Sequence, residues 1–258
     1  MTHPWLLGAR APRVLAHRGF VPPDVDGFVE NTFAAFAAAH AVGAEYVESD
    51  CHLTRDGIVV LFHDADLTRV TGDTRAVADV RHAELTAMMA DRGGLVTAAE
   101  ALDAFPTLRF NLDVKAEDAA LPLGRIIAPH AGRVLITSFS DRRRQRALQA
   151  AHAAGGDPAT SAGQATIARL LAAAATGSRG LVARALAGVQ AIQVPERAGV
   201  VQIVTPRLVR AVHAVGVEVH VWTVNDAERM RALLDAGVDG LVTDRADIAL
   251  ATVRARQI

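Results

Sequence analysis

The 258-residue sequence has one cysteine, one tyrosine and two tryptophans. Its single thiol, Cys51, cannot form a disulfide within the chain, so the composition does not indicate an oxidising compartment. The first 13 residues contain no basic stretch followed by an apolar one, which is the pattern of a secretory signal peptide. The sequence therefore predicts a cytoplasmic protein.

The chain also has no excess of positive charge. Its formal net charge of −1 at pH 7 disfavours duplex nucleic acid and anionic membrane surfaces as partners. No apolar run reaches the roughly 18 residues that a membrane-spanning helix requires. We expect a small-molecule partner, no nucleic acid and no stable membrane association, and the oligomeric state stays open.

Hydrophobic residues make up 51% of the chain, and aromatic residues only 4%. A chain of this length and composition can bury a large aliphatic core without disulfides or metal ions to hold it together. We therefore predict one domain over residues 1–258.

Short runs rich in β-branched and aromatic residues alternate with stretches of helical periodicity. The predicted strands are 14–16, 46–49, 58–62, 109–114, 134–137, 158–162, 191–194, 217–224 and 240–243. The predicted helices are 31–42, 97–104, 121–128, 141–152, 164–175, 206–215, 226–236 and 244–254. Strands 46–49 and 58–62 form a hairpin and count once. Eight strands alternating with helices predict a closed (β/α)8 TIM barrel of the α/β class, and the lack of Gly-x-Gly-x-x-Gly after the first strand argues against a dinucleotide fold.

Residues 66–94 do not follow this alternation. They are polar, contain glycine and mix charges of both signs, without clear periodicity. We expect a small insertion after the second strand region, at the end of the sheet where loops build functional sites.

Polar clusters lie at the borders of the first apolar runs. His17-Arg18-Gly19 follows the first strand, Glu48-Ser49-Asp50 lies in the second, and His63-Asp64 follows the third. Glu30-Asn31-Thr32 precedes the first helix. Groups that can move a proton or bind a metal, placed at several strand ends, predict an active site.

Lysine is almost missing, because Lys115 is the one lysine among 27 Lys and Arg residues. A compact ammonium and a planar guanidinium differ in shape and hydration, so a single lysine suggests a position that needs an ammonium. A general Arg bias that left one lysine by chance is the alternative. Asn111, Asp113 and Lys115 alternate along the same predicted strand and so point to one side.

The motifs of the chain, taken together, resemble the glycerophosphodiester phosphodiesterase family. They are Leu15-Ala16-His17-Arg18-Gly19, Glu30-Asn31-Thr32, Glu48-x-Asp50, Asp56-Gly57, His63-Asp64, Asp113-x-Lys115, Trp222-Thr223-Val224-Asn225 and Asp239-Gly240-x-x-x-Asp244. Each tripeptide alone is weak, whereas eight clusters in the family's order are specific. The resemblance covers nearly the whole chain and implies a barrel with a small insertion after the His-Asp cluster.

The resemblance implies His17 and His63 as the catalytic acid–base pair, a role that suits imidazole with its unperturbed pKa of ~6.5. It implies Glu48, Asp50 and Asp113 as ligands of a divalent cation, and oxygen donors favour Mg²⁺ or Ca²⁺. The residues alone leave a second reading open, in which these carboxylates pair with cationic side chains as a salt-bridged floor. The family usually has Glu at the position of Asp113, which is one methylene shorter.

Four further residues are expected to bind substrate. Arg18 and Lys115 supply the positive charge that a phosphodiester requires. Trp222 packs against the alcohol or glycerol carbons, or else is an ordinary core aromatic, and Glu30 orients Arg18 or a glycerol hydroxyl. Asn31 or Thr32 is predicted to cap the first helix, and Asn225 and Asp244 to cap the helices that follow them.

The function implied is metal-dependent hydrolysis of glycerophosphodiesters to an alcohol and glycerol 3-phosphate, with His17 as base and His63 as acid. Two alternatives stay open. One is a lysophospholipase D or a phosphoinositide-type phosphodiesterase on the same barrel, which the polar insertion disfavours because it offers no apolar rim. The other is an inactive phosphodiester-binding protein, disfavoured because both histidines and all three carboxylates are present.

Overall fold

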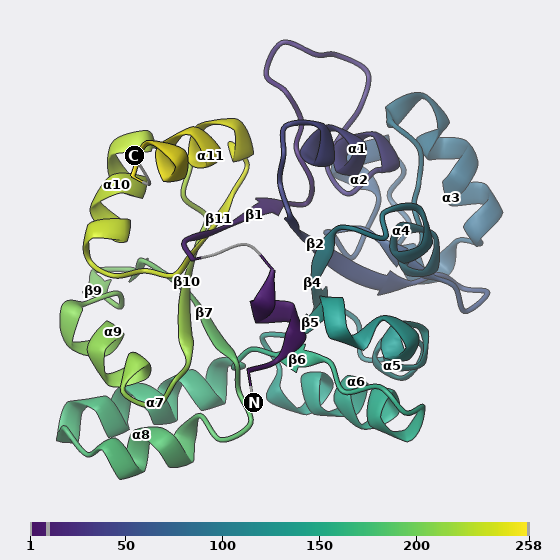
Figure 1. Cartoon of the computed structure of the whole chain (residues 1–258). Coiled ribbons are helices and arrows are strands. Elements are labelled where there is room, and N and C mark those ends of the chain that lie inside the picture. Colours follow the sequence, from purple (N-terminus) through teal and green to yellow (C-terminus); the bar gives the residue numbers. More distant parts are fainter. Residues whose placement is uncertain (1, 9–10, 257–258) are drawn as a thin grey trace.

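The computed structural model describes residues 2–8 and 11–256, and within them eight parallel strands form a barrel (Figure 1). These strands are β1 (Arg13–His17), β2 (Tyr46–Leu53), β4 (Arg109–Val114), β5 (Val134–Thr137), β6 (Ala159–Thr160), β7 (Ala191–Pro195), β10 (Glu218–Trp222) and β11 (Gly240–Thr243). Their order in the sheet is β6-β5-β4-β2-β1-β11-β10-β7. A parallel bridge between Ser161 and Ala191 brings the two outer strands together, so the predicted barrel is confirmed.

Helices surround the barrel and connect consecutive strands (Figure 1). They are α1 (Phe33–Ala41), α4 (Ala98–Ala104), α5 (Ala120–Ile127), α6 (Asp141–Ala153), α7 (Gln164–Thr176), α8 (Arg179–Ala185), α9 (Pro206–His213), α10 (Ala227–Asp235) and α11 (Ala246–Ala255). Gly43, Gly216 and Gly237, which follow α1, α9 and α10, have left-handed φ values of 93°, 76° and 90°, which suit glycine at the end of a helix. The sequence pattern does not predict α8.

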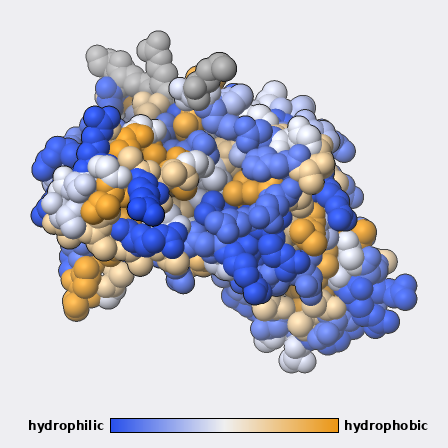
Figure 2. Space-filling view, turned by 90° about the horizontal axis from the view of Figure 1, so that it is seen from below, coloured by the Kyte–Doolittle hydropathy of each residue, from blue (hydrophilic) through white to orange (hydrophobic). Residues whose placement is uncertain are grey.

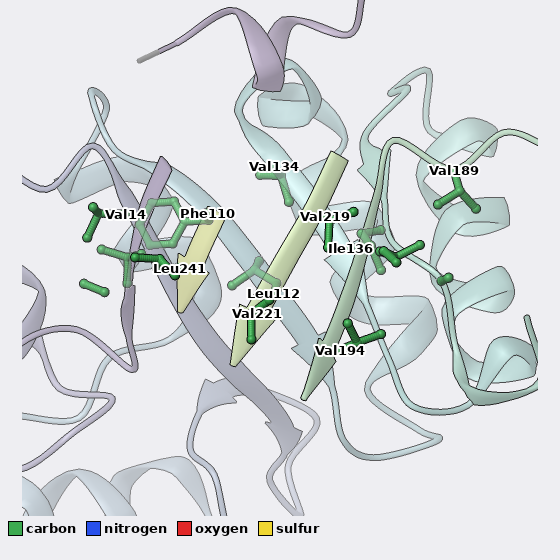
Figure 3. Close-up of a cluster of buried hydrophobic side chains, with 14 of the residues drawn as sticks. Val14, Phe110, Leu112, Val134, Ile136, Val189, Val194, Val219, Val221 and Leu241 are labelled. Carbon is green, nitrogen blue, oxygen red and sulfur yellow. The ribbon is translucent and has the colours of Figure 1, made fainter. Parts of the chain in front are cut away.

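The strands bury both faces, because alternate side chains point outward to the helices and inward to the barrel axis. Outward residues such as Val14, Phe110 and Leu241 join the large aliphatic core between barrel and helices (Figure 3). Inward residues Leu15 and Leu135 form a second cluster inside the barrel. Side chains on the inward face therefore decide what each end of the barrel can do.

The N-terminal end of the barrel is closed by a short 3₁₀ helix, η1 (Pro4–Leu7), which lies across the middle of the ring in Figure 1. Trp5 is fully buried there, and its Nε1 donates a 3.0 Å hydrogen bond to the carbonyl of Phe110. Arg13 lies beside it and forms 2.8 Å contacts to both carboxylate oxygens of Glu218. The sequence pattern did not predict η1.

The short strand β3 (Val59–Leu61) pairs antiparallel with β2, as the predicted hairpin requires. The segment predicted as an insertion follows it and contains α2 (Thr68–Thr71), η2 (Val77–Asp79), α3 (His82–Met89) and η3 (Ala90–Arg92). Its apolar side chains form a separate small cluster that includes Leu67, Leu85 and Met89. The periodicity of the sequence was too weak to predict α3, whose buried side consists of Leu85 and Met89.

Two smaller features complete the fold: η4 (Ala128–Arg133) follows α5, and a hairpin of β8 (Arg197–Ala198) and β9 (Val201–Gln202) follows β7. Across residues 2–8 and 11–256, no helix is both long and apolar enough to cross a membrane. Figure 2 shows the face with α6, α7 and α8, where hydrophilic residues cover most of the surface and hydrophobic ones form small separate groups.

Candidate active site

A pocket of about 460 Å³ opens at the carboxyl ends of the barrel strands. Eight of the nine predicted site residues line it: His17, Arg18, Glu48, Asp50, His63, Asp113, Lys115 and Trp222. The ninth, Glu30, contacts the site through Arg18, whose Nη1 donates a 2.8 Å hydrogen bond to it. The barrel thus brings together side chains that are up to 205 positions apart in the sequence, because parallel strands all end at the same face.

His17, the last residue of β1, is held by a carboxylate from the other end of the chain. Its Nδ1 is 2.6 Å from Oδ1 of Asp244, and Asn225 donates a 2.7 Å hydrogen bond to Oδ2 of the same carboxylate. Burial opposes protonation of His17, but the hydrogen bond to Asp244 and the charge of Glu48 outweigh it and raise the pKa. This contact fixes the ring orientation and leaves Nε2 toward Glu48, at 3.8 Å.

The helix-cap prediction for Asn225 and Asp244 was wrong. The N-cap of α10 is Asp226, whose side chain accepts from the backbone of Arg229, and Arg245 stands at the N-cap of α11. The oxygen of the Asn225 amide accepts hydrogen bonds from the backbone nitrogen of Asp244 and the hydroxyl of Thr243. Both residues therefore position His17, and local patterns could not reveal contacts that join distant strands.

His63, just after β3, has an equivalent partner in its neighbour. Its Nδ1 is 2.6 Å from Oδ1 of Asp64, whose Oδ2 accepts a 2.6 Å hydrogen bond from Arg69. Partial burial works to raise the pKa of Asp64, yet the bonds from Arg69 and His63 lower it overall. Arg69 also donates to Glu30 at 2.6 Å, so one guanidinium of the insertion links the partner of His63 to the partner of Arg18.

Arg18 adopts a left-handed backbone conformation with φ of 59°, and its backbone nitrogen donates to the carbonyl of Glu48. Its Nε lies 3.3 Å from Oδ2 of Asp50. Asn31, with φ of 57°, donates a 3.0 Å hydrogen bond to the same oxygen and accepts one from Ser49. Of the two residues predicted as the cap of the first helix, Thr32 caps α1, whereas the side chain of Asn31 holds Asp50.

The three predicted carboxylates are buried side by side on β2 and β4. Lys115 bridges two of them, with Nζ 3.0 Å from Asp50 and 2.7 Å from Asp113. The structure thus contains the salt-bridged floor that the sequence left open. Burial and the charge of Asp50 raise the pKa of Glu48 to about 8, and burial also raises the pKa of Asp113 despite the nearby ammonium.

The donor chemistry of this cluster suits a divalent cation. Oδ1 of Asp113 is buried and has no hydrogen-bond partner among the described residues. Carboxylate oxygens are the donors that Mg²⁺ and Ca²⁺ prefer, and a cation would displace the proton that burial favours on Glu48. Among residues 2–8 and 11–256, no three carboxylate, imidazole or thiol groups already converge on one point.

Part of the opposite wall of the pocket is apolar. It is built from Phe139, Ala162, Ile167, Val194, Pro195 and Trp222 on the β5, β6, β7 and β10 side. The rings of Phe139 and Trp222 meet edge to face at 5.7 Å, and Nζ of Lys115 lies 5.5 Å from the centre of the Phe139 ring. Trp222 both lines the pocket and packs against the interior cluster, so its two predicted roles are compatible.

Comparison with known proteins places these features in context. The model of the glycerophosphoryl diester phosphodiesterase family matches residues 16–248. A relative from Mycobacterium tuberculosis (strain ATCC 25618 / H37Rv), named probable glycerophosphodiester phosphodiesterase 2, is 39% identical over 241 residues, which cover 91% of this chain and 88% of the relative.

Solved structures share the barrel. A putative glycerophosphoryl diester phosphodiesterase from Silicibacter pomeroyi has a TM-score of 0.75 at 21% identity, with 99% of both chains covered. An Oleispira antarctica phosphodiesterase, solved in complex with the product sn-glycerol-3-phosphate, has a TM-score of 0.71 at 22% identity, with 95% of this chain and 97% of that one covered. At these identities the likeness concerns the fold.

Proposed function

The chain belongs to the glycerophosphoryl diester phosphodiesterase family and is an enzyme of that kind, and we propose that it releases glycerol 3-phosphate through acid–base catalysis by His17 and His63. The observation that carries this proposal is the pair of imidazoles in one pocket, each with Nδ1 held by its own carboxylate at 2.6 Å. A hydrogen on each Nδ1 leaves each Nε2 free to exchange a proton with substrate.

Arg18 and Lys115 bind the phosphate of the substrate. Arg18 lies in the pocket with its guanidinium braced by Glu30 and Asp50, and Lys115 is braced by Asp50 and Asp113. Two fixed cations match the charge of a phosphodiester and stabilise further negative charge on its oxygens during the reaction. The braces keep both groups in place before substrate arrives.

Glu48, Asp50 and Asp113 would hold the divalent cation, Mg²⁺ or Ca²⁺ by the preference of all-oxygen donors. When bound, the cation supplies positive charge that neutralises the phosphate. Loss of the proton from Glu48, whose pKa is about 8, prepares the carboxylate for this role. Asp113 is shorter than the usual Glu, but one of its buried oxygens has no hydrogen-bond partner among the described residues.

In the first step, His17 removes the proton of the glycerol 2-hydroxyl, whose oxygen attacks phosphorus. The bond from phosphorus to the alcohol oxygen breaks, and His63 donates a proton to that oxygen. A cyclic phosphate results. Its internal formation replaces a two-body encounter with a preoriented one.

The second step reverses the roles. His63 takes a proton from water, whose oxygen bonds to phosphorus, and the bond to the 2-oxygen breaks as His17 returns its proton. Glycerol 3-phosphate is the product, and both histidines regain their starting states. Direct attack by water on the diester, without the cyclic phosphate, is the competing route.

Hydrolysis of lysophospholipids at the same phosphate is a second candidate function. The apolar wall that includes Phe139, Ile167 and Trp222 favours it, because a substrate with a long acyl chain requires apolar surface. The polar insertion offers no apolar rim, but this apolar surface lies on the side of β5, β6, β7 and β10.

The test is a panel of soluble glycerophosphodiesters and one lysophospholipid, assayed after chelation and again with Mg²⁺, Ca²⁺ or Mn²⁺. We expect release of glycerol 3-phosphate from at least one soluble diester with an added ion. Faster release of a lysophosphatidate would support the second candidate instead. If no ion yields either product, the proposal is wrong.

The route is tested by phosphorus NMR and by a diester that lacks the 2-hydroxyl. We expect a transient cyclic phosphate from the normal substrate, and binding without turnover for the analogue. Rapid hydrolysis of the analogue would show that water attacks directly.

A further inference from the structure

We propose that Oδ1 of Asn111 is a fixed hydrogen-bond acceptor on the pocket floor that binds a hydroxyl of the glycerol moiety, and that side chains inside the barrel hold it in that orientation. The inference rests on the proposed function and adds a specificity-determining residue to it. Neither the family motifs quoted above nor the acid–base scheme gives Asn111 a role.

Asn111 lies on β4, in register with Glu48 on β2, and its side chain is 1% exposed while lining the pocket. Its Oδ1 is buried and has no hydrogen-bond partner among the described residues. A buried carbonyl without a donor is costly, so native structures rarely keep one unless a ligand or water completes it. Asn111 therefore marks a place where a donor group binds.

A row of buried and half-buried polar side chains determines which end of the Asn111 amide faces the pocket. At the closed end of the barrel, Glu218 pairs with Arg13, and hydrogen bonds from Arg13 and His220 lower its pKa to about 2 despite burial. The carboxylate accepts a hydrogen bond from Nε2 of His220 at 3.0 Å. A ring with its hydrogen on Nε2 has a lone pair on Nδ1, and the Gln193 amide, whose nitrogen faces Nδ1, is oriented to suit that tautomer.

Nδ1 of His220 lies 3.4 Å from Nε2 of Gln193, which is a donor. The other end of the Gln193 amide, Oε1, then faces Asn111 and accepts from its Nδ2 at 3.3 Å. Each contact determines which end of the next side chain donates and which end accepts, so Oδ1 of Asn111 faces the pocket. The negative charge of Glu218 thus fixes the polarity of a contact near the active site.

The fold reserves space for this row. A Cβ on Gly240 would lie 2.5 Å from Cδ2 of His220, so a side chain there would displace the ring. The ring of Trp5 lies 6.0 Å from the imidazole on the closed side. The position of His220, the central member of the row, is therefore determined by its neighbours on two sides.

The ligand donor is a hydroxyl because of where Asn111 lies. It lies on the inward face of β4 in register with Glu48, and precedes Asp113 by two residues, roughly 6–7 Å along the strand. The phosphate itself offers no donor, whereas every glycerophosphodiester carries glycerol hydroxyls whatever its alcohol. Asn111 therefore recognises the part of the substrate that all members of the class share.

The experiment compares the affinity of glycerol 3-phosphate with those of its two analogues that each lack one hydroxyl, measured by calorimetry. We expect wild-type protein to bind one analogue at least ~5-fold more weakly than glycerol 3-phosphate, as loss of the partner of a buried acceptor implies. Asn111→Leu, of similar shape, should bind that analogue and glycerol 3-phosphate within 2-fold of each other. Gln193→Met should reduce the discrimination partly, because the Asn111 amide is then free to turn.

Thr137→Val is the matched control. Thr137 also lines the pocket but already pairs with Ser161, so this variant should discriminate like the wild type. Discrimination that survives in both Asn111→Leu and Gln193→Met would overturn the inference, and so would equal binding of all three ligands by wild-type protein. An Asn111→Leu variant that only requires more cation would show that the amide serves the ion. Binding and turnover are measured independently. Failure of the proposed function would therefore be seen separately, as absence of product.

Discussion

Both ends of the barrel interior contain charged side chains, but the two ends differ in how completely these charges are paired. At the N-terminal end, Glu218 has a guanidinium and an imidazole as partners, and its pKa falls to about 2. At the carboxyl end, the pKa of Glu48 rises to about 8, and Asp113 keeps one oxygen without a partner among the described residues. The charge of Glu218 is paired within the protein, whereas in our proposal the carboxylates of the second end are paired fully only when ligands bind.

The difference separates stability from function. Removal of one partner from a buried ion pair lowers the stability of the folded state, because the other charge is then buried without a partner. Buried carboxylates that are not fully neutralised lower the stability of the folded state, but they can bind a ligand. Changes at the carboxyl end should therefore affect activity, and changes at the N-terminal end should affect unfolding.

The largest expected effect comes from the two histidines at the carboxyl end. His17→Ala or His63→Ala should lower kcat by at least ~100-fold, the usual contribution of a positioned acid or base, with an almost unchanged melting temperature. His152→Ala, which removes an exposed histidine paired with Asp157, is the control. Near-normal turnover in either variant would exclude that histidine from the mechanism.

At the closed end, Glu218→Gln should lower the free energy of unfolding by on the order of 3 kcal/mol at pH 7. The folded-state pKa of Glu218 is depressed from 4.5 to about 2, so its stabilisation is present above pH 4.5 and is lost as the pH falls toward 2. The difference between wild type and variant in denaturant titrations should shrink over that interval. A difference that stays constant would contradict the assignment.

Lys115→Arg tests whether the carboxyl end requires a compact ammonium. A bulkier guanidinium between Asp50 and Asp113 should crowd the cation site and lower kcat by about 10-fold without a change in folding. Circular dichroism and steady-state kinetics measure the two properties. Normal kinetics would show that the site does not require an ammonium at this position.

The smallest effect concerns Arg69, which links Asp64 to Glu30 at the edge of the site. Arg69→Gln should lower kcat/KM by up to about 5-fold, since an exposed ion pair contributes ~1 kcal/mol or less, and Arg69→Lys should recover part of the loss. Arg75→Gln is the control, because Arg75 pairs with Asp73 and Glu84 in the same insertion. Equal losses in Arg69→Gln and Arg75→Gln would point to a general effect on the insertion.

The sequence predicted the barrel because alternation of strands and helices is a local pattern that repeats. It also predicted side chains such as His17 and Asp113 in one pocket, since residues at strand ends must meet in a barrel. It did not predict the supports of the site. Asp244 contacts His17 across 227 positions, and Arg69 contacts Glu30 across 39. Such partners depend on the closed ring and on the path of the insertion.

The helix caps show the same limit of sequence patterns. Asn31 and Asp244 stand just before helices, which is where caps occur, yet their side chains bond to Asp50 and His17. In each case the neighbouring residue takes the N-cap position. A local pattern predicts a helix boundary to within about two residues but not which of two adjacent residues occupies the N-cap position.

The most direct test of the difference between the two ends is cation binding measured together with activity. After exhaustive chelation, wild-type protein should be inactive, and calorimetric titration with Mg²⁺ or Ca²⁺ should show binding in step with recovered turnover. Glu48→Gln and Asp50→Asn should require more cation for the same recovery, while Tyr46→Phe at the closed end should titrate like wild type. Full activity without bound cation after chelation would contradict the account.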